Sequence, residues 1–395
     1  MPGPLDGIKI VELSVAITGP LAAGILVDQG AECIKIERGP GGDILRHLGC
    51  KIQDISSSFQ ICNRGKRSVV LDLSRAEGLA ITKDLITDAD VVIQNYRPGV
   101  AERLGLAYSD IVAYNPEVIY ADLSGFGPTG PHASRRVYDT AIQAASGLAD
   151  NQTGLNDEKP VFLRQLIADK LTAHTMSQAI TAALFARSRG TGGQRIELSM
   201  LDAAIAFLFV DGADHEILLD ADHSGTQSMT AANTPIPLAD GHVAVAVPDN
   251  TGFHGLADAF GVDSSDPDLA NLSDRLQNQD KAREIRKQVM ENAQTVTVEE
   301  ATEALDARGV PFGIIRQVEE VADDPQVKAN QTFVAHTHPT AGRVNQPRPP
   351  AVFHGTPVAL REHSAPTLGQ HTDEVVAETG RGDQINALRE AGVIA

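Results

Sequence analysis

The sequence predicts an α/β protein with a parallel sheet in its first half and a smaller domain of strands and helices further along the chain. Three observations support this class. Apolar, β-rich segments alternate with helical segments through the first half of the 395 residues. The composition changes and becomes more polar after about residue 225. Apolar residues make up 42% of the chain, which is enough for a sizeable core.

Strands and helices alternate regularly in the first half. Expected strands cover residues 8–14, 31–38, 68–73, 90–96 and 118–124, and expected helices cover 20–30, 74–89 and the short segment YSDIVAYNP. Pro20 near the start and Gly30 at the end of the first helix are typical of helix boundaries. Such an alternation forms a parallel sheet with right-handed crossovers.

Ligands of parallel sheets bind beyond the carboxyl ends of the strands. The first candidates for a site are therefore the residues that follow the predicted strands: Ala16, Ile17, Arg38, Asn95, Tyr96 and Gly125 onward. The segment GFGPTG at 125–130 also matches a dinucleotide-binding motif, which requires a helix to begin within it. Because Pro128 and Pro131 do not suit that helix, we expect a loop there.

A long helix is expected over 169–187, and a Gly-rich exit follows it. A strand end and a helix are then expected over 196–209, an alternating strand at 242–247, polar helices after it, an apolar strand at 309–316 and a last helix at 384–395. We expect a large domain at 1–225 that is completed by a returning segment at 331–395, and a small domain at 226–330.

Composition excludes several classes of function. The net charge of −19 repels nucleic acid and anionic membranes. No apolar run approaches the ~18 residues of a membrane span, and the first residues do not have the pattern of a signal peptide. The three cysteines, Cys33, Cys50 and Cys62, lack metal-ligand spacing and fit a reducing compartment. We therefore expect a cytoplasmic protein that binds neither nucleic acid nor membranes.

Local groups of positive charge are informative in so acidic a chain. Three occur: Arg64 with Lys66 and Arg67, Arg97 with Arg103, and Arg135 with Arg136. Each could bind a small polyanion, although for any single group solvated side chains without a partner are the more common case. The acid- and histidine-rich segment 211–223 and the pair His336 and His338 lack a complete set of metal ligands, so we expect no metal.

A lone carboxylate, Asp169, stands where an otherwise apolar segment turns into the long helix. Aspartate is a preferred helix N-cap, because its oxygen accepts a hydrogen bond from an unpaired backbone N–H group. The helix dipole also favours a negative charge at this end. Capping is therefore one interpretation of Asp169, and a catalytic role is the other.

Several long motifs, in order along nearly the whole chain, resemble the family III CoA-transferases, also called the CaiB/BaiF family. The motifs are PLDGIKIVELS, ITGPLAAGILVDQGAECIKIERGPGGDILR, NRGKRSVVLDL, NYRPGVAERLGL, SGFGPTGP with Tyr138-Asp139 and Gln143-Ala144 behind it, the stretch 162–194, and APTLGQHTDEVV. The resemblance implies a Rossmann-like large domain, a small α+β domain, and two chains interlocked in a homodimer.

The resemblance also implies an activity and a set of site residues. Family members transfer CoA between an acyl-CoA thioester and a free carboxylic acid, through anhydride and thioester adducts of an aspartate that matches Asp169. The helix N-terminus would keep that carboxylate ionised and nucleophilic. The positions that match CoA-contacting residues of the family are Ile17, Arg38, Leu71, Asn95, Tyr96, Arg103 and Arg136. CoA, carried as the acyl-CoA substrate, is the expected cofactor.

Three departures from the family pattern bear on the substrate and the reaction. Formyl-CoA transferases have Gln near the substrate where this chain has Ile17, which argues against a role in oxalate metabolism. Racemases of the family have His where this chain has Tyr138, so two-base proton transfer would lack one of its partners. A 2-methylacyl-CoA racemase is therefore the second choice of enzyme. The glycine run that serves the formyl-CoA branch is replaced by a Ser-, Thr- and Asn-rich loop at 224–234. A CoA-binding protein without catalysis is a further alternative.

Overall fold

The computed structural model describes residues 3–153, 159–221, 234–247, 249–358 and 364–395. The chain forms two compact units, Met1–Val210 with Gln331–Ala395, and Asp211–Asn330. The predicted domain boundary at 225/226 lies outside the described residues and stays a prediction.

The larger unit contains a six-stranded sheet with the strand order β5-β2-β1-β6-β7-β8. Its strands are β1 (Lys9–Glu12), β2 (Glu32–Glu37), β5 (Arg67–Val70), β6 (Val91–Gln94), β7 (Ile119–Ser124) and β8 (Gln194–Ser199). Every neighbouring pair is parallel, which confirms the predicted parallel sheet. The chain builds outward from β1 to one side and from β6 to the other. The strand order therefore reverses between β1 and β6, where sheets of this kind bind ligands.

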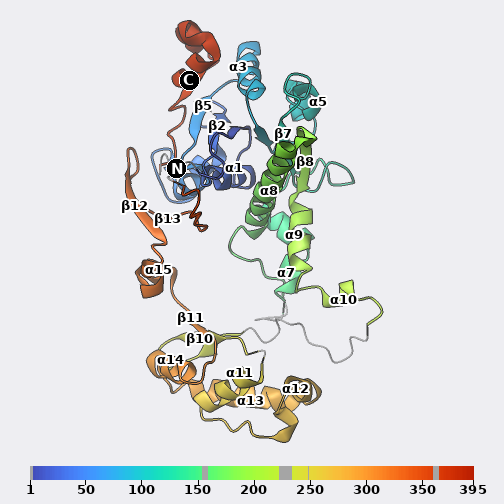
Figure 1. The fold of residues 1–395 in the computed structure, drawn as a ribbon, viewed down its shortest axis with the longest axis vertical. Coiled ribbons are helices and arrows are strands. Elements are labelled where there is room, and N and C mark those ends of the chain that lie inside the picture. The colour runs from blue at the N-terminus through green and yellow to red at the C-terminus, as the bar shows by residue number, and fades with distance from the viewer. Residues whose placement is uncertain (1–2, 154–158, 222–233, 248, 359–363) are drawn as a thin grey trace. The chain divides into compact units, whose positions relative to one another are not determined.

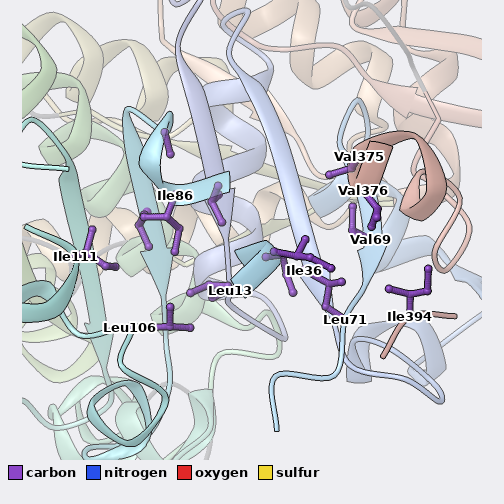
Figure 2. Close-up of a cluster of buried hydrophobic side chains, with 14 of the residues drawn as sticks. Leu13, Ile36, Val69, Leu71, Ile86, Leu106, Ile111, Val375, Val376 and Ile394 are labelled. Atoms are coloured by element: carbon purple, nitrogen blue, oxygen red, sulfur yellow. The ribbon is translucent and has the colours of Figure 1, made fainter. Parts of the chain in front are cut away.

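Both faces of the sheet are covered, because successive strand residues point to opposite sides. Val91 and Ile93 of β6 pack with helices α1 (Thr18–Val27) and α8 (Ile167–Ala186). Val92 between them packs on the opposite face, with α3 (Ala76–Thr87), α5 (Tyr108–Ile111) and α16 (Thr372–Val376). Figure 2 shows part of this second cluster, with Val375 and Val376 of the returning segment beside Val69 of β5. The returning segment 331–395 thus completes the core of the larger unit.

Shorter elements connect this framework. They are η1 (Ile44–His47), β3 (Lys51–Ile52), β4 (Ile55–Ser56), α2 (Ser57–Asn63), α4 (Val100–Leu104), α6 (Asp139–Ala145), α7 (Leu148–Asn151), η2 (Arg187–Thr191), α9 (Met200–Leu208), β12 (Phe333–His338), β13 (Gly342–Pro347), η5 (Ala377–Arg381), η6 (Gly382–Gln384) and α17 (Ile385–Glu390). Helices α8 and α9 lie side by side (Figure 1). No helix begins within 125–130, which confirms the predicted loop.

A buried ion-pair network fixes the first strands. The Glu12 carboxylate accepts from Lys35 Nζ at 2.7 Å and from Lys66 Nζ at 2.6 Å, and all three side chains are fully buried. Although burial alone raises its pKa, the two ammonium groups bring the pKa of Glu12 down to about 2. Arg64 pairs with Asp28, and Arg67 pairs with two glutamates. The cations at 64–67 are therefore already paired with carboxylates of the fold.

The smaller unit has its own core around a three-stranded antiparallel sheet. The strands are β9 (Ile236–Pro237), β10 (His242–Val245) and β11 (Phe312–Ile314), in the order β11-β10-β9. The helical elements are α10 (Asp214–Ile217), α11 (Asn250–Ala259), η3 (Pro267–Leu269), α12 (Leu272–Gln277), α13 (Gln279–Ala293), α14 (Val298–Asp306), η4 (Val318–Asp323) and α15 (Pro325–Ala329). Val243, Leu256 and Leu305 join strand and helices in one apolar cluster. Among the described residues of the whole chain, no helix is long and apolar enough to cross a membrane.

Candidate active site

A cavity of about 620 Å³ opens at the carboxyl ends of β1, β6 and β7. Its wall includes the residues that follow these strands, at 15–18, 95–98 and 124–125, together with segment 133–140 and the start of α8. The cavity therefore lies where the strand order reverses, as expected for a ligand site in a parallel sheet.

Asp169 lies in the first turn of α8 and lines this cavity. The helix begins at Ile167 and its N-cap residue is Leu166, whose side chain forms no capping hydrogen bond. The capping interpretation of Asp169 is therefore wrong. The backbone N–H of Asp169 instead donates to Oδ2 of Asp139 at 3.1 Å, so a neighbouring helix satisfies this end of α8. The carboxylate of Asp169 is left available for chemistry.

Asp139 is a buried acid whose two oxygens are both occupied. It begins α6, is 1% exposed, and accepts from Gln143 Nε2 at 2.5 Å through Oδ1. The same Gln143 amide donates to the Leu163 carbonyl oxygen at 3.1 Å and accepts from the Leu163 N–H at 2.9 Å. Asp139 and Gln143 thus fix the chain on both sides of Leu166, and they position the start of the helix that carries Asp169.

Thr18, the first residue of α1, holds the Asp169 carboxylate from the opposite side. Its hydroxyl donates to Asp169 Oδ1 at 2.5 Å, and its side chain is almost fully buried. Within the described residues, the structure gives Asp169 Oδ2 no hydrogen-bond donor. Burial raises the pKa of Asp169 to about 6, and the charge of Asp139 adds to this, whereas the Thr18 hydrogen bond opposes it. The helix N-terminus therefore does not keep this carboxyl at a low pKa.

The loop between β1 and α1 is held in an uncommon conformation. Ala16 has a left-handed φ of 67°, and its N–H donates to Asp43 Oδ1 at 2.9 Å. The Asn95 amide accepts from the Val15 N–H at 3.0 Å and donates to the Val15 carbonyl oxygen at 2.8 Å. Asn95 therefore positions this loop, and with it Thr18.

The predicted site residues divide into two groups. Those that line the cavity are Asp169, Ile17, Asn95, Tyr96, Arg136 and Tyr138. Arg38 follows β2 and Arg103 lies in α4; both are exposed but neither forms part of the cavity wall. Leu71 also lies outside the cavity wall: it is 1% exposed and packs in the core. The roles of these residues toward CoA stay predictions.

Sequence reasoning missed the residues that position Asp169. Asp139 and Gln143 belong to a motif that the sequence displays, but nothing in that motif indicates that they bond to the segment before α8. Thr18 follows Ile17 at the carboxyl end of β1, so the rule that selected Ile17 could have selected it. Asp43 lies in the GD-x-x-R motif, and only the fold brings it to Ala16.

Positive charge on the cavity wall comes from Arg97, Arg135 and Arg136. Within the part of the chain that the structure describes, no ion pair is formed by these three side chains, so they are available to an anionic ligand. In the same described residues, no group of three or more His, Cys, Asp and Glu side chains could hold a metal ion. His223 of the acid-rich segment lies outside the described residues.

Comparison with known proteins gives a consistent result. The model of "CoA-transferase family III" matches residues 5–372. An acyl-CoA transferase of Fusarium pseudograminearum is 33% identical and covers 99% of this chain and 88% of its own length. A succinate–glutarate CoA-transferase of Agrobacterium fabrum is 31% identical, with 95% of each chain covered. A CaiB/BaiF family protein from Brucella suis has a solved structure that superposes with a TM-score of 0.81 at 30% identity, over 96% of this chain and 100% of that one.

Proposed function

The chain belongs to CoA-transferase family III and is an enzyme that uses CoA thioesters, and we propose that Asp169 is its nucleophile. In this proposal the enzyme moves CoA from an acyl-CoA thioester to a free carboxylic acid. The observation that carries the proposal is the position of the Asp169 carboxylate on the cavity wall. One of its oxygens accepts from the Thr18 hydroxyl, and the backbone N–H of Asp169 is bonded to Asp139, so the Asp169 carboxylate does not cap its own helix.

The proposed reaction begins with attack of an Asp169 oxygen on the thioester carbonyl, which forms a mixed anhydride and releases CoA thiolate. The thiolate then attacks the aspartyl carbonyl, forms an aspartyl-CoA thioester and expels the first acid as its carboxylate. The acceptor carboxylate attacks this thioester to give a second anhydride and thiolate. Attack of the thiolate on the acceptor's acyl carbonyl yields the new acyl-CoA and restores Asp169.

An aspartate suits this chemistry because its adducts keep the acyl group activated. A serine ester would not return CoA to a free acid without a further energy source. The pKa of about 6 supports the role, since Asp169 is mostly ionised at neutral pH while burial limits its stabilisation by water. The cations Arg97, Arg135 and Arg136 on the cavity wall support binding of a polyanion such as CoA.

Replacement of the nucleophile tests the proposal. We expect Asp169→Ala to abolish CoA transfer, measured by mass spectrometry of acyl-CoA products with a panel of acids, while CoA still binds. Asp150, an exposed acid of α7, provides the control variant Asp150→Ala, which should behave as wild type. Activity of Asp169→Ala within about tenfold of wild type, or roughly 1.4 kcal/mol of barrier, would contradict the assignment.

The proposal includes an interlocked homodimer, as the family resemblance implies. Exposed apolar side chains at the ends of α8 and α9 support an interface: Phe185 is 63% exposed and Phe207 is 48% exposed. Light scattering on the purified full chain should give twice the mass of 41.9 kDa. A monomer at micromolar concentration would contradict the dimer and leave the activity proposal unaffected.

A further inference from the structure

The hydrogen bond from Thr18 makes the two oxygens of Asp169 unequal. Oδ1 accepts the Thr18 hydroxyl at 2.5 Å, whereas the structure gives Oδ2 no donor among the described residues. Among the described residues, the only other hydrogen-bond partner of this hydroxyl is Met200 Sδ at 4.0 Å, and a thioether is a weak acceptor. The hydroxyl proton is therefore directed at Oδ1, and Oδ2 is the oxygen free to attack a thioester.

The first bond formed decides what Oδ1 becomes. When Oδ2 attacks, Oδ1 remains as the carbonyl oxygen of the anhydride and later of the aspartyl-CoA thioester. Each attack on the aspartyl carbonyl, by CoA thiolate or by the acceptor carboxylate, places a negative charge on this oxygen in the tetrahedral intermediate. A donor that already lies at hydrogen-bond distance needs no reorganisation to stabilise that charge.

We infer that the Thr18 hydroxyl is the oxyanion donor for the two steps that occur at the aspartyl carbonyl. The inference rests on the proposed function, because it requires a covalent adduct on Asp169. The two steps at the substrate's acyl carbonyl place their charge on the substrate's own oxygen and not on Asp169 Oδ1.

The surroundings hold Thr18 in place. It is a β-branched residue with few rotamers and begins α1, which packs against α8. The next residue, Gly19, lies so close to Ser14 that a Cβ atom there would be 2.2 Å from Ser14 Oγ. On the other side, Asp43 fixes the backbone of Ala16. The donor is thus pre-organised by the loop between β1 and α1.

Two variants at position 18 separate the hydroxyl from the shape of the side chain. Thr18→Val keeps the branched shape and removes the donor, and Thr18→Ser keeps the donor. Thr172→Val is the matched control, since Thr172 is buried in α8 and donates to the Ala168 carbonyl oxygen away from Asp169. Circular dichroism establishes that each variant is folded, and a binding measurement establishes that it still binds acyl-CoA.

We expect Thr18→Val to lower kcat by between about 10²- and 10³-fold, the typical effect of losing one oxyanion donor. Thr18→Ser should stay within about tenfold of wild type and Thr172→Val within about threefold. In single-turnover experiments, the trapped aspartyl-CoA adduct of Thr18→Val should decay more slowly by the same factor when acceptor acid is added. The pH midpoint of its activity should also rise, because the Thr18 hydrogen bond lowers the pKa of Asp169.

Three results would overturn the inference: a Thr18→Val enzyme within about threefold of wild type, equal losses in the Val and Ser variants, or unchanged decay of the adduct. Wild-type enzyme that turns over without any adduct on Asp169 would instead refute the proposed function, and the inference with it. The wild-type adduct measurement therefore distinguishes the two failures.

Discussion

The Asp139 carboxylate accepts the backbone N–H of Asp169 at 3.1 Å, so the acid that satisfies this helix end is 30 residues away from Asp169 in the sequence. The two carboxylates consequently differ in environment. Asp139 is buried with both oxygens bonded, and Asp169 has one oxygen bonded to Thr18. Asp169 is therefore suited to react, and Asp139 to hold it in position.

This arrangement gives the pH dependence of activity a definite sign. As the proposed nucleophile, Asp169 must be ionised to react. Its pKa is raised to about 6, so kcat/KM should rise with pH through a midpoint near 6. Because the charge of Asp139 raises the pKa of Asp169, Asp139→Asn should move the midpoint to lower pH. Asp150→Asn, which removes an exposed charge, should leave it in place. An unchanged or higher midpoint in Asp139→Asn would contradict this account of the site.

The same raised pKa predicts a pH-dependent stability. Asp169 has an ordinary pKa of 3.8 when exposed and about 6 in the fold, so its contribution is fully present below pH 4 and is lost as the pH rises through 6. Asp169→Asn carries no charge at any pH. At pH 8 it should be more stable than wild type by on the order of 3 kcal/mol in denaturant unfolding, and the difference should vanish near pH 4. A pH-independent difference would contradict the raised pKa.

Arg38 should contribute to CoA binding without taking part in the chemistry. It is exposed at the carboxyl end of β2, the edge of the sheet where ligands bind. Arg38→Ala should raise the Kd for CoA in calorimetry by roughly tenfold, the scale of one charge-assisted contact of about 1.4 kcal/mol, with a smaller change in kcat. Arg343→Ala, an exposed arginine in β13, is the charge-matched control. An effect confined to kcat would exclude the binding role.

The site argues against proton exchange of the racemase kind. A two-base exchange needs a second base beside Asp169. The neighbouring Asp139 is 1% exposed, and its oxygens accept from Gln143 Nε2 and from the Asp169 N–H, which is a positioning role. Tyr138 stands where racemases have His, and it is 75% exposed. We therefore expect no incorporation of deuterium at the α-carbon of a 2-methylacyl-CoA incubated in deuterated water. Incorporation at the rate of turnover would place the protein in the racemase branch.

Much of the larger unit could be predicted from local patterns, because its strands are short apolar runs between helices. The alternation around β6 and β7 fixed their positions to within a few residues. The hairpin of β3 and β4 was missed, since strands of two residues leave no periodic signal. The strand order could not be predicted from local patterns either, because it is set by contacts between strands that are distant in the sequence.

The sequence indicated the position of Asp169 but not the residues that hold it in place. A long motif marks Asp169, whereas the capping interpretation failed because Asp139 approaches α8 only when α6 packs against it. No sequence motif singles out Thr18, and its proposed role depends on a contact with Asp169, which is 151 residues further along the chain. The cations at 64–67 looked like a binding site in sequence, and only the fold reveals their carboxylate partners, which include Asp28 and Glu12.

The central claim is that Asp169 becomes covalently modified during turnover, and trapping tests it most directly. The enzyme is incubated with an acyl-CoA donor and no acceptor acid, then treated with hydroxylamine or borohydride, and the peptides are mapped by mass spectrometry. The account predicts a hydroxamate or a reduced side chain at residue 169, in a peptide from the segment 162–187, and none in Asp169→Asn. An unmodified peptide from an enzyme that is turning over would contradict the account, and transfer would then occur directly between bound substrates.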